Sequence, residues 1–253
     1  MRKISYLVTL LLLAILAHKG YAQSYQGIII IKKNTHFITA GYNFGATAPY
    51  TLPNTIRKIE KYTLQFTPSV GYEFHRKLNK KWGVGSGVRV DVKGMKITDS
   101  VQYFHTILTM DDGEFEGDFS GTNQTTAKNT YLTVPIYGTF QSGRWHYRLG
   151  GYVAYALSKS FSGSVSNGYI RKGNSLGEKV FIDESKFDFS DEMKSWDWGL
   201  HAAVGREIGH AWSINLNIQA GIDPIFPSSF RGVGYKLRNI NLNIGAAFNL
   251  SYL

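Results

Sequence analysis

Cysteine is absent from the 253 residues of the chain. Its absence excludes disulfide bonds and a lipid-modified cysteine at the start of an exported protein, although export would permit disulfides. Long apolar runs are also scarce, because no stretch after residue 22 reaches the length of a membrane-spanning helix. Mean hydropathy is slightly negative. Any membrane segment beyond residue 22 would therefore consist of strands in which polar and apolar residues alternate.

The first 22 residues have the pattern of a secretory signal peptide. Met1 to Lys3 is basic, Ile4 to Ala17 is an apolar run of 14 residues, and Gly20-Tyr21-Ala22 is a small-x-small cleavage site. The alternative is a transmembrane anchor, for which 14 residues are short. We expect cleavage after residue 22 and export of the remaining chain.

Acidic residues are fewer than basic ones, 18 against 28, which gives a formal net charge of +10. Three of the positive charges, Arg2, Lys3 and Lys19, leave with the signal peptide. A strongly basic chain can bind nucleic acid. An exported protein does not routinely meet nucleic acid, however, and the basic residues are scattered rather than gathered in one stripe. We therefore expect no nucleic-acid partner.

Residues 130–157 alternate between apolar and polar positions on both sides of a tight turn at Ser142-Gly143. Period two indicates β-strands, because successive side chains point to opposite faces. Runs of about ten residues or more suit tilted strands that cross a bilayer. The alternate positions expected on the apolar face are Leu132, Val134 and Ile136 before the turn and Trp145, Tyr147 and Leu149 after it.

Eight segments fit this pattern, and we predict an all-β fold: a membrane-spanning, up-and-down antiparallel β-barrel of eight strands over residues 35–253. Tight gaps alternate with long ones, as in barrels with short turns on one rim and long loops on the other. An even count places both ends of the barrel at the short-turn rim, which is periplasmic in outer-membrane barrels. Residues 23–34 then form a short periplasmic leader or an early start of the first strand. The predicted strands are 35–45, 61–76, 81–97, 128–141, 144–160, 195–208, 211–223 and 238–252, and the predicted long loops are 46–60, 98–127, 161–194 and 224–237.

Three tryptophans each begin a strand directly after a predicted short turn. An amphipathic indole is most stable at a membrane interface, so we expect an aromatic girdle at this rim. A soluble sandwich, with its apolar side inward, is the alternative. The signal peptide, the strand length and the aromatic positions favour the membrane. The predicted girdle consists of Trp82, Trp145, Trp212, Phe248 and Tyr252, and candidates for the opposite rim are Phe44, Tyr62, Tyr155 and Trp198.

In each predicted strand, polar residues alternate with the apolar ones. If the apolar residues face lipid, the polar residues face the barrel interior. An eight-stranded barrel has an interior that side chains just fill. Buried charges must be paired, so we interpret the charged residues as an ion network that plugs the lumen, with a functional cluster as the alternative. The predicted network consists of Glu73, Arg89, Asp91, Arg148, His201 and Glu207.

No motif of the sequence indicates catalysis, and we expect no catalytic, cofactor-binding or metal site and no cofactor. The seven histidines are spread along the chain without a catalytic spacing. Residues 98–127 are acidic and lack Lys and Arg, which indicates either a solvated loop or, with less support, a divalent-cation site. Residues 161–194 are predicted as a mobile surface loop, in which Glu178 to Ile182 could form a short strand.

Two prolines lie inside predicted strands. Pro68 and Pro135 each lack a ladder donor, and a closed barrel has no edge strand in which proline is tolerated. We therefore expect a local bulge or kink at each position.

Four short motifs resemble the PorT-type outer-membrane β-barrel domain family. Tyr131-Leu132-Thr133-Val134-Pro135-Ile136 is similar to its Tyr-Leu-x-(Ile/Val)-Pro-(Leu/Ile) strand. The others are Leu149 to Tyr152, Trp198 to Gly205 and Ala220 to Asp223, so the resemblance covers most of residues 35–253. It implies an eight-stranded outer-membrane barrel, and one family member serves the type IX protein secretion system.

The final strand also resembles the signal that the barrel-assembly machinery reads, with Asn243, Gly245, Phe248 and Leu250, although the chain ends in Leu253 rather than Phe. We expect a monomeric, non-enzymatic outer-membrane protein with a structural or interaction role. The alternatives are a PorT-like accessory of protein secretion, a narrow solute channel and, with least support, an enzyme with a site at the barrel rim. Expected partners are outer-membrane lipid and lipopolysaccharide, the barrel-assembly machinery and an envelope or secretion-system protein.

Overall fold

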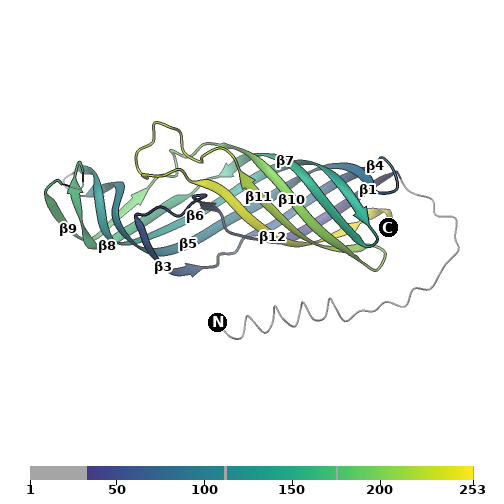
Figure 1. Cartoon of the computed structure of the whole chain (residues 1–253), viewed down its shortest axis with the longest axis horizontal. Helices are drawn as coiled ribbons and strands as arrows, with labels where there is room; N and C mark the ends of the chain where they lie inside the picture. The colour runs from purple at the N-terminus through teal and green to yellow at the C-terminus, as the bar shows by residue number, and fades with distance from the viewer. Residues whose placement is uncertain (1–32, 111–112, 175, 253) are drawn as a thin grey trace. The chain divides into compact units, whose positions relative to one another are not determined.

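A computed structural model describes residues 33–110, 113–174 and 176–252 of the chain (Figure 1). Eight of its strands form a closed antiparallel ring in which each strand pairs with the next along the ring. The last strand returns to the first, with Phe37 opposite Asn249 and Phe44 opposite Leu242. The ring strands are β1 (Asn34–Phe44), β4 (Pro68–Lys77), β5 (Trp82–Met110), β6 (Gly113–Ser142), β7 (Trp145–Ser158), β10 (Trp196–Ile208), β11 (Trp212–Gly221) and β12 (Arg238–Asn249).

The predicted all-β, eight-stranded barrel is therefore confirmed. The predicted signal peptide, residues 1–22, lies outside the described residues, as does the predicted leader up to residue 32. β1 begins at Asn34, one residue before the predicted start. The last strand ends at Asn249, and a 3-10 turn, η1 (Leu250–Tyr252), follows it.

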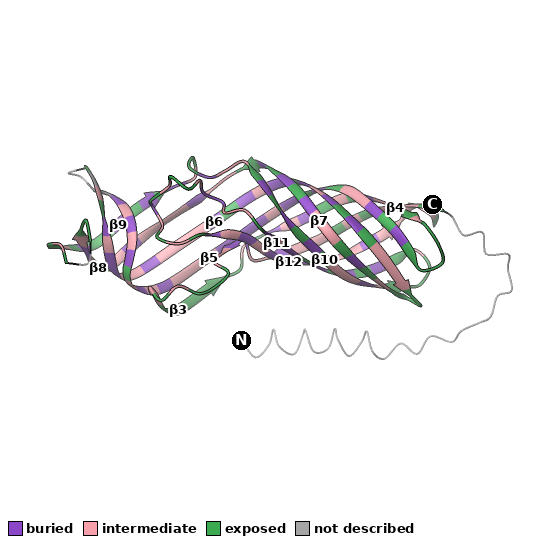
Figure 2. Cartoon of the chain, turned by 45° about the horizontal axis from the view of Figure 1, so that its top comes forward, coloured by how far each residue is buried: buried purple, intermediate pink, exposed green. Residues whose placement is uncertain are grey.

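The ring has apolar side chains outside and polar side chains inside. Along β11 the exposed residues are Trp212, Ile214, Leu216 and Ile218, and the serine and asparagines between them are buried. Figure 2 shows the same alternation of buried and exposed positions along the neighbouring ring strands. A water-soluble sheet protein would bury its apolar side chains. Apolar side chains on the outside are instead expected of strands that face lipid.

Short turns connect the ring strands at one rim, the rim at which the described chain ends (Figure 1). Gly143 and Gly209 adopt φ values of 58° and 68° in two of these turns, a region in which glycine carries no steric cost. In the third turn the side chain of Asn79 accepts hydrogen bonds from the backbone nitrogens of Lys81 and Trp82.

At the opposite rim the chain builds a second layer of structure, which we call the cap and define as the described residues of the segments 46–63, 94–128, 161–194 and 222–237. It contains the outer parts of β5 and β6, together with β2 (Thr47–Ala48), β3 (Ile56–Thr63), β8 (Phe161–Lys172) and β9 (Lys179–Asp188). β8 pairs with β6 and β9, β9 meets β5 at one residue pair, and β3 pairs with β5. The prediction that residues 98–127 and 161–194 form loops is therefore wrong, although β9 includes most of the short strand expected at Glu178 to Ile182. The predicted loop 46–60 also contains β2 and the start of β3.

A hydrophobic core explains why these segments form a sheet. Phe104 and Leu108 of β5 lie on the same buried face as Phe119 of β6. A register shift between Val101 and Phe104, with Tyr103 at a φ of 54°, interrupts the period-two pattern there. The remaining buried core residues of the cap are Ala46, Met95, Val101, Ala127, Phe161, Val165, Ile170, Ile182, Phe187, Phe189, Met193, Ile225, Phe226 and Leu237.

The expectation of a bulge at each proline is wrong: Pro68 begins a strand, and Pro135 interrupts pairing without a bulge. The predicted strand 61–76 is divided: its first residues belong to β3 in the cap, and Pro68 is the first residue of β4, a position at which proline is tolerated. Pro135 lies within β6, where pairing with β5 lapses between the Ser86–Ile136 and Arg89–Thr133 pairs without a register shift. The Ser86 hydroxyl donates to the Pro135 carbonyl at 2.9 Å.

Within the part of the chain that the structure describes, no helix is long and apolar enough to cross a membrane.

Candidate functional site

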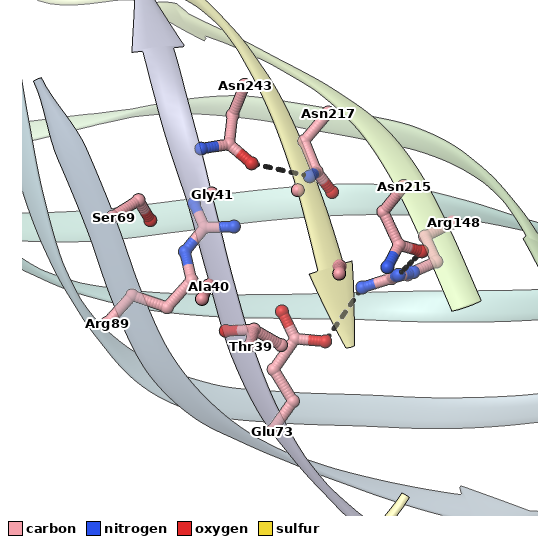
Figure 3. Close-up of a pocket in the computed structure, with 12 residues that line it drawn as sticks. Thr39, Ala40, Gly41, Ser69, Glu73, Arg89, Arg148, Asn215, Asn217 and Asn243 are labelled. Carbon is pink, nitrogen blue, oxygen red and sulfur yellow. Dashed lines mark hydrogen bonds and ion pairs between the residues drawn. The ribbon is translucent and has the colours of Figure 1, made fainter. Parts of the chain in front are cut away.

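The interior of the ring contains an ion pair between strands that are not neighbours. Arg148 of β7 donates to the Glu73 carboxylate of β4 at 2.7 Å. The same carboxylate oxygen accepts a hydrogen bond from the Tyr137 hydroxyl at 2.9 Å and lies 3.4 Å from the His75 ring. Arg148 also donates to the Asn215 side chain at 2.5 Å. Both ends of this pair are thus anchored to further strands, and Figure 3 shows them meeting across the lumen.

A second pair lies on β5. Arg89 is 3.4 Å from Asp91, and the Ser69 hydroxyl donates to the other oxygen of Asp91 at 2.6 Å. Arg89 and Asp91 share a parity of the same strand and are almost completely buried, at 3% and 0% exposure. Burial of this degree requires each charge to have an opposite charge or a hydrogen-bonding group nearby.

A third group continues the interior toward the cap. Lys93, fully buried, lies 4.0 Å from Asp197 and about equally over the rings of Tyr131 and Tyr152, at 5.0 and 5.2 Å. The Tyr152 hydroxyl donates to Asp197 at 2.9 Å. An ammonium between two aromatic faces is held by cation–π attraction as well as by its carboxylate.

Asparagine side chains bridge the strands on the other side of the lumen. Asn217 donates to Asn243 at 3.0 Å, and Asn243 donates to Asn43 at 2.8 Å, which links β11, β12 and β1. Asn43 in turn donates to the Val92 carbonyl of β5 at 2.9 Å. These bonds satisfy polar groups that water would otherwise have to reach.

The ring interior is filled and charge-balanced. Among the described residues it buries three cations, Arg89, Lys93 and Arg148, against Glu73, Asp91 and Asp197. The cavity around Glu73 and Arg148, shown in Figure 3, measures about 10 Å³. The cavity at this level therefore has room for about one water molecule.

The structure brings five of the six predicted network residues together: Glu73, Arg89, Asp91, Arg148 and His201. His201 is fully buried, with its ring 5.4 Å from that of Tyr137. Glu207 lies apart from them: it is exposed near the short-turn rim and accepts a hydrogen bond from Gln141 at 2.9 Å.

Sequence reasoning missed several members of the network. Lys93 lies on the same face of β5 as Arg89 and Asp91, and Asp197 lies on the same face of β10 as His201. The alternation along each strand therefore indicates that both side chains point into the ring. Tyr137 and His75, which contact Glu73, and His146, 3.3 Å from Arg148, are also outside the predicted network, because the alternation places them on the inner face without showing that they reach this ion pair.

The predicted girdle residues lie at the short-turn rim. Trp82, Trp145 and Trp212 begin β5, β7 and β11 and are 55%, 43% and 54% exposed. Trp82 packs against Phe140, and Trp212 packs against Phe248, with ring centroids 4.8 and 4.9 Å apart. Tyr252 follows in η1 and is exposed.

The acidic segment of the cap holds one histidine between two acids. The His105 ring nitrogens lie 3.1 Å from Asp118 and 3.2 Å from Glu116. In the described ranges, with residues 111–112 outside them, no group of three or more His, Cys, Asp or Glu side chains could hold a metal ion.

Comparison with known proteins places this architecture in a family. The family model described as outer membrane protein beta-barrel domain matches residues 21–227. The chain belongs to this outer membrane protein β-barrel domain family. A comparison with curated proteins finds no significant match.

Among solved structures, two small outer-membrane proteins are similar in fold. One is Ail of Yersinia pestis, in complex with the heparin analogue sucrose octasulfate: identity is 10%, the match covers 86% of this chain and 99% of Ail, and the TM-score is 0.38. The other is OprG of Pseudomonas aeruginosa, with 15% identity, coverage of 86% and 97%, and a TM-score of 0.30. The eight-stranded ring follows from the strand pairings of the chain itself.

Proposed function

We propose that the chain is a non-enzymatic outer-membrane protein in which the ring is an anchor and the cap has a structural or interaction role at the cell surface. The supporting observation is the contrast between a ring interior filled by balanced charges and a cap with its own hydrophobic core. In outer-membrane barrels the short turns face the periplasm and the longer connections face outward, so the cap would project from the cell.

The proposed partners follow from the same surfaces. Outer-membrane lipid and lipopolysaccharide would contact the apolar exterior of the ring, which includes Leu149 and Leu200 at 71% and 59% exposure. The barrel-assembly machinery would read β12, and an envelope or secretion-system protein would bind the cap.

Electrical recording in planar lipid bilayers separates this proposal from a narrow solute channel. We expect no stepwise conductance from the purified protein, because paired side chains fill the ring interior. A general porin inserted under the same conditions is the control for detection. Stable single-channel openings that require the folded protein would contradict the proposal.

A second candidate is a PorT-like accessory of protein secretion, and one observation favours it. The Tyr131 to Ile136 motif includes Pro135, an unusual residue inside a ring strand, at the place where β5–β6 pairing lapses. Deletion of the gene should then reduce the amount of secreted cargo in the medium, with restoration by the intact gene. Unchanged secretion would exclude this role and leave the anchor proposal standing.

A further inference from the structure

The cap contains a cavity of about 200 Å³ that shares no lining residue with the small cavity of the lumen. It lies where β3, β5, β6, β8 and β9 meet the segment 233–237. Its wall is mostly apolar. Its apolar side chains include Ile56, Met95, Ile97, Phe104, Phe161 and Phe187.

Polar groups interrupt this apolar wall: the hydroxyls of Thr47, Thr125 and Tyr235 and the side chains of Asp99 and Asn123. Asp99 of β5 and Asn123 of β6 both line the cavity, and each is 3% exposed. The Asn123 amide nitrogen donates to Asp99 at 3.0 Å and to the Thr125 hydroxyl at 3.1 Å, so the amide orientation is fixed. The Asn123 oxygen is buried and, among the described residues, has no hydrogen-bond partner.

The charge of the cavity is negative and uncompensated. In the part of the chain that the structure describes, Asp99 is in no ion pair. Glu60 of β3 acts on it as a like charge, and Tyr235 shares the cavity wall. Burial raises the pKa of Asp99 to about 6, and Glu60 acts in the same direction, so the carboxyl is ionised at neutral pH. A buried anion with no cation beside it is costly.

We propose that this cavity binds a small primary amine with a compact hydrocarbon body. The ammonium group donates to the Asp99 carboxylate and to the Asn123 oxygen, and the hydrocarbon packs against side chains such as Ile97 and Phe104. Size supports this class of ligand, because an apolar cavity of about 150 Å³ holds benzene. A single ring with a one-carbon amine side chain therefore fits in 200 Å³.

The test is a titration of the full-length protein in lipid nanodiscs with benzylamine at pH 7.5, followed by NMR. We expect saturable binding to the wild type and an affinity about tenfold or more lower for Asp99→Asn, because a hydrogen bond to a charged partner contributes that much. Asp183→Asn is the matched control. It makes the same substitution at an exposed cap residue outside the cavity, and it should bind benzylamine like the wild type.

Two further measurements keep the test decisive. Benzyl alcohol has the same ring with a neutral hydroxyl in place of the ammonium group, and its affinity should fall less on Asp99→Asn than that of benzylamine, because only benzylamine also loses the attraction between opposite charges. The second measurement is the pH dependence of benzylamine binding to the wild type, which requires no substitution. Its affinity for benzylamine should fall between pH 7.5 and pH 5 as Asp99 is protonated, with Glu60 and Tyr235 as the other titratable groups that act on this carboxyl.

Absence of saturable benzylamine binding to the wild type would overturn the proposal. Equal affinities of the wild type and a folded Asp99→Asn protein would also overturn it, as would an affinity that does not change with pH. None of these results bears on the conductance of the ring, so the anchor proposal is tested separately.

Discussion

Glu73 and Arg148 belong to β4 and β7, which are not neighbours in the ring, so their bond joins opposite parts of the barrel wall. Both side chains are almost fully buried, at 2% and 5% exposure. Removal of one partner from a buried pair leaves an uncompensated charge, whereas removal of both costs much less. We therefore expect the pair to contribute little net stability compared with the cost of removing one partner.

Arg148→Met should destabilise the protein by about 3–5 kcal/mol, because Glu73 is left buried without its cation. The double variant Glu73→Gln/Arg148→Met should recover a large part of this loss. Arg144→Met, in an exposed turn residue, is the matched control and should change stability by less than about 0.5 kcal/mol. Urea unfolding of refolded protein in detergent measures all three. A value for Arg148→Met within error of the Arg144→Met value would contradict the account.

Asp99 makes the stability of the cap depend on pH. Its folded pKa of about 6 exceeds its ordinary value of 3.8, so its contribution to stability is fully present below about pH 4 and is lost as pH rises through 6. The difference between the two values corresponds to about 3 kcal/mol.

The free energy of unfolding of Asp99→Asn relative to the wild type should therefore rise by up to about 3 kcal/mol between pH 4 and pH 7 and then stay level. Asp183→Asn, at an exposed residue, should follow the wild type throughout. Urea unfolding curves at intervals of one pH unit give the comparison. A constant difference between Asp99→Asn and the wild type would show that this carboxyl does not titrate as the geometry requires.

At the scale of the strand, the position of a residue relative to lipid decides what a substitution does. Leu149 lies on β7 between Trp145 at one rim and Tyr155 toward the other, and it is 71% exposed. Phe181 on β9 is 78% exposed but belongs to the cap. Water accessibility alone does not distinguish the two, whereas the membrane does.

Leu149→Arg should destabilise the inserted barrel by about 2–4 kcal/mol, because it places a charge near the bilayer midplane. Phe181→Arg should change stability by less than about 1 kcal/mol, as expected for a surface position. Unfolding of both variants in phospholipid bilayers gives the comparison. Equal effects would contradict the assignment of the ring exterior to lipid.

The ring strands could be predicted from the sequence because their signals are local. Alternation within β7 and β11, and a tryptophan directly after each short turn, are visible within about ten residues. The cap could not be predicted in the same way. A bulge beside Tyr103 shifts the alternation of β5, and the strands of the cap are stabilised by a shared core that joins β5 and β6 to β8 and β9. Acidic composition alone indicated a loop.

The alternation of residues along each strand predicts only part of the charge network in the lumen. It indicates which residues share the inner face, but it does not determine which charges meet. Arg148 reaches Glu73 across the lumen, and Lys93 meets Asp197, because strand registers and the closure of the ring bring them together. Glu207 shares the alternation, yet it lies so close to the rim that it remains exposed.

At the scale of the whole molecule, the described residues between 33 and 252 form one closed barrel with a polar, filled interior, an apolar exterior and a cap on one rim. Because the ring closes, its described strands leave no unpaired edge facing lipid, which could not solvate the backbone. The central claim is that this barrel spans the outer membrane.

Heat-modifiable migration of fractionated cell envelopes tests this claim most directly. The protein should co-fractionate with the outer membrane, and the unboiled sample should migrate differently from the boiled one, because a closed barrel resists detergent until it is heated. A protein that is recovered in the soluble periplasmic fraction and migrates identically with and without boiling would contradict the account.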